Sequence, residues 1–232
     1  MRIAALIPAA GRGKRMAEET PKAFLPLGGA PLLAHTLRQF EASSIVGEVV
    51  VLAPPGDGIR LAEEMAARHG IRKVSRVVAG GAERQDSVYR GLKALENRTD
   101  LVLIHDGARP FATPELIERV AAETRLAKAA VAAVPVRDTI KEIGADGMVL
   151  RTLNRGPLWE TQTPQGFHYP LILEAYEKAF RDGFYGTDDA ALVERLGVKV
   201  KVVLGSRFNL KITTPEDLVL GKALLQSLAA EG

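Results

Sequence analysis

The sequence predicts an α/β protein whose mainly parallel sheet is covered by helices on both faces. Short apolar runs of strand length recur along the chain and alternate with longer segments of helical periodicity. Most of these runs are apolar throughout, as expected of strands that are buried on both faces. No internal repeat, low-complexity segment or long linker divides the 232 residues. We therefore expect one domain over residues 1–232.

The strands and helices are expected to alternate along the chain. Strands are expected at residues 3–8, 48–53, 73–79, 100–110 (ending in a polar cluster), 129–135, 198–204 and 209–213. Helices are expected from Pro31 through Phe40, through Leu61 to Arg68, from the turn at 80–88 to about Glu96, from Thr113 to about Lys128, from Pro170, from Gly186 to Leu196, and from Thr214 towards the C-terminus. Residues 160–167 are expected only to return the chain to the body.

One segment breaks this rhythm and predicts a projecting β-hairpin. Residues 136–143 alternate polar and apolar side chains, residues 144–147 form a turn, and residues 148–153 run back. A two-stranded hairpin is only marginally stable by itself in water. We therefore expect an arm at about 137–158 that packs on something, and a second copy of this chain is the natural candidate.

Composition excludes several classes of function. Hydrophobic residues make up 47% and charged residues 25%, and the formal net charge of +3 is too mild to indicate nucleic acid or a membrane as the main partner. Cysteine is absent, which excludes a disulfide framework and a cysteine metal site. No segment resembles a signal peptide or a membrane span, so a cytoplasmic protein is expected.

The loop after the first strand has the character of a phosphate site. The apolar run ends at Pro8, and Gly11 and Gly13 follow, where the missing Cβ lets the backbone approach a ligand. Backbone N–H groups of such a loop can point at phosphate oxygens. Cations surround the same loop: Arg12, Lys14, Arg15 and Lys22. The loop lacks both the Walker motif and the dinucleotide fingerprint, and glycines after a strand are common, so the glycines alone do not decide the matter.

Two further polar clusters follow expected strands. The turn at residues 80–88 opens a helix, whose N-terminus is suited to an anion, although a plain turn is the alternative. His105, Asp106 and Arg109 arrive together after the fourth strand. In open α/β sheets, ligands bind beyond the carboxyl ends of the strands. Asp106 could therefore hold Mg²⁺ through oxygen, although a lone aspartate there is often only a turn former.

These motifs together carry a family resemblance that covers nearly the whole chain. The segments are Pro8 to Met16 with Lys22, Gly80 to Val88, His105 to Pro110, Pro135 to Thr139, Thr161 to Gln165, Thr187-Asp188 and Lys211 to Leu218. Their order resembles that of the 2-C-methyl-D-erythritol 4-phosphate cytidylyltransferases of isoprenoid biosynthesis. The resemblance implies a three-layer, Rossmann-like nucleotidyltransferase fold and cytidylyl transfer from CTP to 2-C-methyl-D-erythritol 4-phosphate. It also implies a divalent ion, usually Mg²⁺, and a homodimer with interlocking arms.

The resemblance also implies roles for individual residues. Catalytic roles fall on Arg15, Lys22, Arg155 and Lys211. Positions that bind CTP are Ala9, Ala10, Gly11, Gly13, Lys14, Gly81 and Ser87. Positions that bind the second substrate are Asp106, Arg109, Thr139, Arg155, Thr163, Thr187 and Lys211, with Asp106 also near the metal. In the family, the arm residue aligned with Arg155 reaches the partner's site. Two positions depart from relatives: Ala82, where Asp is frequent, and Gly107, where some carry Ala.

Elementary chemistry agrees with this assignment. A phosphate monoester has a second pKa of about 6, so it is largely ionised at neutral pH and needs no general base. The obstacle is repulsion between two phosphate anions, which clustered cations relieve. Three alternatives stay open: a cytidylyltransferase for another polyol phosphate such as ribitol 5-phosphate, a nucleotide-binding module without turnover, and, more weakly, a nucleic-acid binder, for which aromatic residues among the basic ones are lacking.

Overall fold

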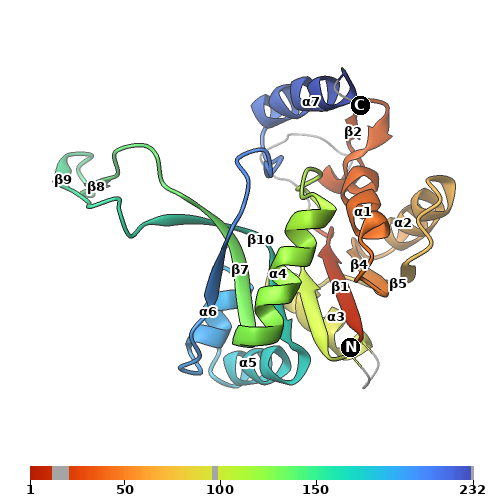
Figure 1. Cartoon of the computed structure of the whole chain (residues 1–232), viewed down its shortest axis with the longest axis horizontal. Coiled ribbons are helices and arrows are strands. Elements are labelled where there is room, and N and C mark those ends of the chain that lie inside the picture. The colour runs from red at the N-terminus through yellow and green to blue at the C-terminus, as the bar shows by residue number, and fades with distance from the viewer. Residues whose placement is uncertain (12–20, 96–98, 231–232) are drawn as a thin grey trace.

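The computed structural model describes residues 1–11, 21–95 and 99–230. Within these ranges, seven strands form a sheet in the order β11-β7-β10-β6-β1-β4-β5, which helices cover on both faces (Figure 1). The strands are β1 Ile3–Pro8, β4 Glu48–Ala53, β5 Val74–Ala79, β6 Leu101–Ile104, β7 Ala129–Pro135, β10 Trp159–His168 and β11 Lys201–Leu204. All neighbouring pairs are parallel except those that β10 makes with β6 and β7. The predicted three-layer α/β fold is confirmed.

The helices form two layers, and one helix lies outside them. The first layer is α1 Leu32–Ala42, α2 Asp57–Arg68 and α4 Pro114–Ala127, and the second is α3 Arg84–Ala94, α5 Tyr169–Arg181 and α6 Asp189–Glu194. Helix α7 Pro215–Ala230 lies beside a small ribbon of β2 Pro26–Leu27 and β3 Ala30–Pro31, which follows the short 3-10 helix η2 Lys22–Phe24 (Figure 1). Among the described residues, no helix combines the length and the apolar run that crossing a membrane requires.

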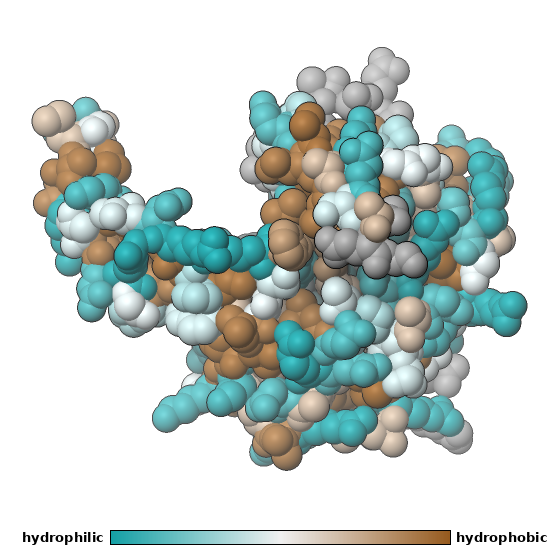
Figure 2. Space-filling view, turned by 45° about the horizontal axis from the view of Figure 1, so that its top comes forward, coloured by the Kyte–Doolittle hydropathy of each residue, from teal (hydrophilic) through white to brown (hydrophobic). Residues whose placement is uncertain are grey.

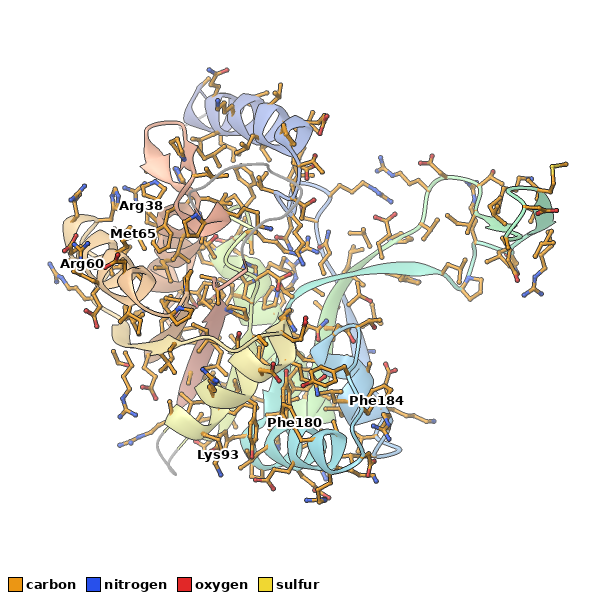
Figure 3. The ribbon with its side chains drawn as sticks, turned by 180° about the vertical axis from the view of Figure 1, so that it is seen from behind. Arg38, Arg60, Met65, Lys93, Phe180 and Phe184 are labelled. Carbon is orange, nitrogen blue, oxygen red and sulfur yellow. The ribbon has the colours of Figure 1, made fainter. Side chains whose placement is uncertain are left out.

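The apolar strands are buried because both of their faces are covered. Successive side chains of a strand point to opposite faces. Ile7 of β1 therefore belongs to the core under α1, together with Leu37, whereas Leu6 belongs to the core under α3, together with Leu92. All four side chains are fully buried. Phe180 of α5 packs on the second face, which Figure 3 shows from behind. This packing fixes the ends of the strands, where the predicted ligand loops begin.

Strand β10 is the main element that the sequence did not predict. These residues are expected from the sequence only to return the chain to the body, and they are mostly polar and include Pro164 and Gly166. The strand nevertheless lies inside the sheet, between β7 and β6, and its register shifts between Thr161 and Gln165, around the proline that cannot donate a ladder hydrogen bond. Its buried amide side chains find partners, as when Gln165 donates to the Asp188 carboxylate at 2.9 Å. Satisfied polar groups of this kind make a polar central strand possible.

The strand predicted at residues 209–213 is wrong. This segment instead crosses the ends of the strands as a loop, and the Ile212 N–H donates to the Ala108 carbonyl at 2.8 Å. Ile212 is fully buried in a small cluster with Leu27 and Phe111. The apolar character that suggested a strand serves this packing. The next segment agrees with the prediction, because Asp217 accepts the Thr214 N–H at 2.9 Å and so caps the start of α7.

The predicted hairpin is present as a projecting arm. It consists of β8 Lys141–Ile143 and β9 Val149–Thr152, joined through a turn in which Gly147 has a φ of 80°. Figures 1 and 2 show the arm standing clear of the body. Its distal part exposes a group of apolar side chains: Ile143, Met148, Val149 and Leu150. An apolar surface on an isolated hairpin fits the expectation that the arm packs on something.

Candidate active site

A pocket lies beyond the carboxyl ends of β1, β5 and β6. The chain builds β1, β4 and β5 outwards in one direction and then returns to place β6 on the other side of β1. Ligands of open α/β sheets bind at such a reversal. The residues that line this first pocket are 8–11 after β1, 81–84 after β5, 106–108 after β6, and Lys22, Ala23, Ser87 and Lys211. The topology thus brings together the three loops that the sequence singled out.

A second pocket adjoins the first. Its lining comes from β10, the start of α6 and the loop after β6: Arg84, Asp106, Arg109, Thr161, Gln162, Thr163, Gln165, Thr187, Asp188 and Lys211. Three of these residues, Arg84, Asp106 and Lys211, also line the first pocket. They therefore form the boundary between the two pockets. Two ligands seated side by side would meet at this boundary.

The loop after β5 is held tightly against the loop after β1. A Cβ on Gly80 would lie 2.3 Å from the Cβ of Ala10, so only glycine allows this approach. The Ser87 hydroxyl accepts the Gly81 N–H at 2.9 Å and donates to the Glu83 carbonyl at 3.1 Å. Ser87 therefore holds the turn at residues 81–83 in place and also lines the pocket. The N-terminus of α3 is thereby aimed at the first pocket, where its partial positive charge favours an anion.

The loop after β1 is open towards the same pocket. Ala9, Ala10 and Gly11 line it, and a Cβ on Gly11 would meet none of the described residues within 4 Å. Packing against the described residues therefore does not require glycine at position 11. Lys22 lines the pocket from the start of η2. The remaining predicted phosphate contacts of this loop lie outside the described residues: Arg12, Gly13, Lys14 and Arg15.

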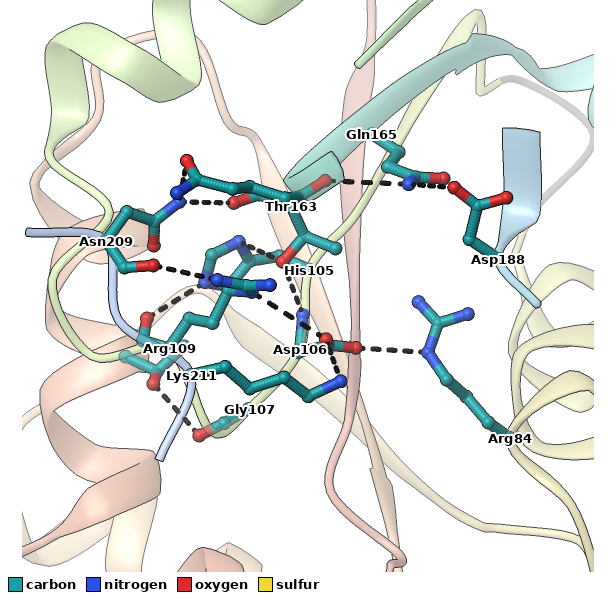
Figure 4. Close-up of polar contacts among 12 residues, drawn as sticks. Arg84, His105, Asp106, Gly107, Arg109, Thr163, Gln165, Asp188, Asn209 and Lys211 are labelled. Carbon is teal, nitrogen blue, oxygen red and sulfur yellow. Dashed lines mark hydrogen bonds and ion pairs between the residues drawn. The ribbon is translucent and has the colours of Figure 1, made fainter. Parts of the chain in front are cut away.

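Asp106 is the centre of the charge cluster at the boundary (Figure 4). Its Oδ1 accepts from Arg84 Nε at 3.0 Å, its Oδ2 pairs with Lys211 Nζ at 2.7 Å, and Arg109 Nε lies 3.8 Å from Oδ2. Burial raises the pKa of this carboxyl, but Arg84 and then Lys211 outweigh burial and hold the pKa far below its ordinary value. Asp106 is therefore a carboxylate throughout the physiological pH range.

His105 organises the turn that carries Asp106 (Figure 4). Its Nε2 lies 3.0 Å from the Arg109 carbonyl, which can only accept, so Nε2 carries the proton. Its Nδ1 then accepts from the Thr163 hydroxyl at 3.0 Å, and the Thr163 oxygen accepts the Asp106 N–H at 3.1 Å. Burial lowers the pKa of His105 to about 4, so the ring is neutral at pH 7. His105 thus holds the turn and is not placed to act as an acid or base.

Arg84 is the functional residue that sequence reasoning missed. Its Nη1 and Nη2 donate to the two oxygens of the buried Asp189 at 2.9 and 2.7 Å, while its Nε reaches Asp106. The quoted stretch at residues 80–88 contains Arg84, but nothing in the local pattern separates it from a solvated cation. Its partner Asp189 lies 105 residues further along the chain. Only the folded structure brings the two together.

The other predicted residues fall in two places. Arg109, Thr163, Thr187 and Lys211 line the second pocket. Asn209, which was not singled out, links two of them, because its side-chain amide donates to the Thr163 carbonyl at 2.8 Å and its backbone carbonyl accepts from Arg109 Nη1 at 2.8 Å. Thr139 and Arg155 are exposed on the arm and line neither pocket, and Arg155 donates to the Arg137 carbonyl.

The donor set at the boundary suits a metal that arrives with its ligand. In the described ranges, nowhere do three His, Cys, Asp or Glu side chains gather into a metal cluster. Asp106 supplies one carboxylate beside both pockets. Mg²⁺ keeps several waters and is commonly held by one or two carboxylates together with substrate phosphates. The residues present therefore fit Mg²⁺ bound to a phosphate ligand rather than a metal caged by the protein alone.

Fold and site together define an α/β protein of the nucleotidyltransferase class. The glycine-containing loop, the helix N-terminus and the cations meet at one edge of a mainly parallel sheet. The family model of 2-C-methyl-D-erythritol 4-phosphate cytidylyltransferase matches residues 3–227, and the chain belongs to this family.

Individual relatives agree with this membership over almost their full lengths. The 2-C-methyl-D-erythritol 4-phosphate cytidylyltransferase of Pelotomaculum thermopropionicum is 50% identical over 226 residues, which is 97% of this chain and 95% of the relative. The crystal structure of the Thermus thermophilus cytidylyltransferase is 40% identical with a TM-score of 0.82, covering 97% of this chain and 100% of that one. The 4-diphosphocytidyl-2C-methyl-D-erythritol synthase structure from Anaerococcus prevotii is 36% identical with a TM-score of 0.85, covering 97% and 96%. The predicted family is confirmed.

Proposed function

We propose that this protein transfers a cytidylyl group from CTP to 2-C-methyl-D-erythritol 4-phosphate in the non-mevalonate pathway. The products are 4-diphosphocytidyl-2-C-methyl-D-erythritol and pyrophosphate. Family membership supports the reaction. The observation that carries it in this chain is the pair of adjoining pockets with Arg84, Asp106 and Lys211 at their boundary. A transfer between two bound phosphates needs such an arrangement.

CTP is assigned to the first pocket. Its phosphates would lie against the backbone of Gly11 in the pocket that Lys22 also lines, and Ala9 and Ala10 would lie around the cytosine and ribose. The nucleoside would lie on the Gly81 turn that Ser87 fixes. Partial positive charge at the start of α3 supports an anion here. Gly13, Lys14 and Arg15 are assigned to the triphosphate from the family resemblance.

The polyol phosphate is assigned to the second pocket. Lys211 and Arg109 supply positive charge there, and Thr163 and Thr187 supply hydroxyl groups at the wall. Asp106 is suited to accept hydrogen bonds from substrate hydroxyls at the boundary. The charges of the pocket therefore match a ligand that carries both a phosphate and hydroxyl groups.

The reaction follows from this placement. An oxygen of the ionised polyol phosphate attacks the α-phosphorus of CTP, a new P–O bond forms, and the bond to the β-phosphate breaks to release pyrophosphate. The nucleophile needs no base, since it is already ionised at neutral pH. Lys22, Arg15 and Lys211 are assigned to neutralise the phosphate charges and to hold the reacting groups in line. In this chain, positioning and charge neutralisation therefore supply most of the catalysis.

Mg²⁺ is assigned to Asp106 together with the phosphates of CTP. The ion would neutralise charge on the triphosphate. Arg84 already holds Asp106 at Oδ1, and Lys211 holds it at Oδ2. Each carboxylate oxygen has a second lone pair, which leaves capacity for the ion or for one of its waters. Titration with Mg²⁺ and with EDTA tests this assignment through the release of pyrophosphate.

We also propose that the chain works as one domain and forms a homodimer through the arm at about 137–158. The apolar tip of the arm needs a covering surface. The base of the arm, the edge strand β11 and the loop after β11 expose further apolar side chains: Trp159, Val202, Leu204 and Phe208. Figure 2 shows apolar surface both on the arm and on the body beneath it. Thr139 and Arg155 lie on the arm and line neither described pocket of their own subunit, so they are assigned to the second pocket of the partner subunit.

Mixing two impaired variants tests the shared site, with the polyol phosphate kept at a concentration where each variant alone turns over slowly. Arg155→Ala and Lys211→Ala subunits are refolded together, and each is refolded alone as the control. If Arg155 acts in the partner's site, half of the randomly formed dimers carry one intact site, and about a quarter of the wild-type activity returns. Failure to regain activity, while native mass spectrometry shows that mixed dimers form, would place Arg155 in its own subunit's site or outside both.

Pyrophosphate release measured with CTP and a panel of polyol phosphates tests the reaction itself. We expect turnover with 2-C-methyl-D-erythritol 4-phosphate and dependence on Mg²⁺. Turnover with ribitol 5-phosphate alone would reassign the second pocket, and binding of CTP without turnover on any acceptor would indicate a nucleotide-binding module. A CTP-dependent enzyme fits the cytoplasmic location that the sequence predicts.

A further inference from the structure

Arg84 lies between the boundary of the two pockets and the helix layer that contains α5 and α6. All three of its nitrogen positions are engaged by carboxylates: Nε by Asp106, and Nη1 and Nη2 by Asp189. A planar guanidinium forks in this way, and a single ammonium cannot. Arg84 thus contacts one carboxylate at the pocket and another in the interior. Because three of its five N–H donors are committed to carboxylates of the protein, an indirect role towards a substrate is favoured.

Arg84 links Asp106 at the pocket to Asp189 in the interior, and the Asp189 end of this link is held in place by further contacts. Asp189 is fully buried at the start of α6, and its Oδ1 also accepts the Tyr176 hydroxyl at 2.5 Å. Tyr176 is itself buried in α5. The neighbouring Asp188 caps α6 and is tied to β10 through Gln165, as Figure 4 shows. Arg84 therefore transmits the fixed position of α5 and α6 to the carboxylate at the end of β6.

The outer end of the link matters because Asp106 also binds Lys211. The Lys211 ammonium lies 2.7 Å from Asp106 Oδ2, yet the second substrate needs this ammonium for its phosphate. An ammonium has three donors, so Lys211 must redirect at least one of them to the phosphate when the substrate enters, in a partial exchange with Asp106. Arg84 keeps Oδ1 paired during the exchange, so the buried carboxylate is not left alone. Without Arg84, Asp106 would hold Lys211 more strongly and would compete with the substrate.

We propose that Arg84 is a positioning residue that fixes Asp106 at the boundary of the two pockets and so makes Lys211 available to the phosphate of the second substrate. The inference rests on the proposed function. Arg84 acts through Asp106 and Lys211, and its own guanidinium does not contact the reacting atoms.

Kinetics of Arg84→Lys test the inference, with Arg195→Lys as the matched control. The control makes the same chemical change in a salt-bridged arginine of the second helix layer, where Arg195 pairs with Asp182 at 2.9 Å, away from both pockets. In Arg84→Lys we expect the KM for the polyol phosphate to rise at least about tenfold, because a misplaced group of about 1 Å has effects of this size or larger. The KM for CTP and all constants of the control should stay within about twofold of wild type.

The split between the two KM values separates positioning from a merely structural role. Partial misfolding lowers the amount of active enzyme and hence the apparent kcat, but it leaves both KM values unchanged. Tyr176→Phe serves as a milder variant, since it removes one hydrogen bond to Asp189 and retains the ring. We expect the same selective rise in KM, smaller in size. If Arg84→Lys does not fold, Tyr176→Phe decides the question.

The Lys211→Ala background gives the second test. If Arg84 acts through Lys211, Arg84→Lys should raise the KM for the polyol phosphate much less in this background than in wild type. Equal effects in both backgrounds, or equal rises in both KM values, would overturn the inference. Wild-type enzyme is assayed alongside with both substrates: absence of wild-type turnover would overturn the proposed function, whereas normal turnover with an unaffected Arg84→Lys would overturn the inference alone.

Discussion

Replacing Asp106 by asparagine removes the negative charge that holds the boundary cluster together. The Asp106 side chain is 10% exposed, and breaking a buried ion pair by removing one partner costs about 3–5 kcal/mol. Two features reduce this cost. Arg84 keeps both of its bonds to Asp189, and the Lys211 side chain is 39% exposed and can regain water. We therefore expect Asp106→Asn to lower the free energy of unfolding by about 2–3 kcal/mol.

Thermal unfolding at two pH values measures this loss. For a chain of this size, about 1 kcal/mol corresponds to roughly 2–4 °C, so the Tm should fall by about 5–10 °C at pH 7. The cations hold the pKa of Asp106 below its ordinary value, so the stabilisation is present above the unfolded-state pKa of about 4 and is lost as the pH falls below it. The difference between wild type and variant should hence be constant from about pH 5 to 8 and shrink below about pH 4.

The reasoning would be refuted by an unchanged Tm at pH 7, or by a difference that grows on acidification. Asp182→Asn is the matched control. Asp182 also pairs with two cations, Lys178 and Arg195, but it lies at the surface, so its loss should change the free energy of unfolding by less than about 1 kcal/mol.

Three further substitutions probe the two pockets by steady-state kinetics. Lys22→Ala should lower kcat at least about 100-fold, as loss of a transition-state donor does, and near-normal turnover would remove Lys22 from the mechanism. Arg155→Ala should raise the KM for the polyol phosphate strongly and leave the KM for CTP little changed; the reverse pattern would move it to the nucleotide half. Gly80→Ala places a Cβ 2.3 Å from the Cβ of Ala10 and should raise the KM for CTP, whereas the control Gly47→Ala, with its nearest atom at 3.7 Å, should not. Equal behaviour of the two glycine variants would contradict the role of the loop contact.

The sequence predicted the fold well wherever burial alone shapes an element. Strands β1 and β4 match their predicted bounds, because both are apolar runs covered on two faces. Strand β10 could not be found in this way. Its polar side chains are satisfied by partners such as Asp188 and Ser206, which lie far along the chain. Local periodicity carries no information about such partners.

In the site, too, features with a local sequence signal could be predicted, and features that depend on distant partners could not. The loops that line the first pocket can be predicted from the small residues at strand ends, and the topology brings these loops together. The role of Arg84 cannot be predicted in this way, because it depends on two carboxylates, Asp106 and Asp189, that come from distant parts of the chain. Motif reasoning finds groups that approach a ligand. Residues that hold those groups in place need the structure.

A crystal structure with a non-hydrolysable CTP analogue, Mg²⁺ and 2-C-methyl-D-erythritol 4-phosphate tests the central claim most directly. We expect the α-phosphorus of the nucleotide and the attacking oxygen of the polyol phosphate to lie about 3–3.5 Å apart. They should meet at the boundary formed by Arg84, Asp106 and Lys211, with Lys211 turned from the carboxylate to the phosphate. Two ligands bound on separate surfaces, or a polyol phosphate remote from Lys211, would contradict the account.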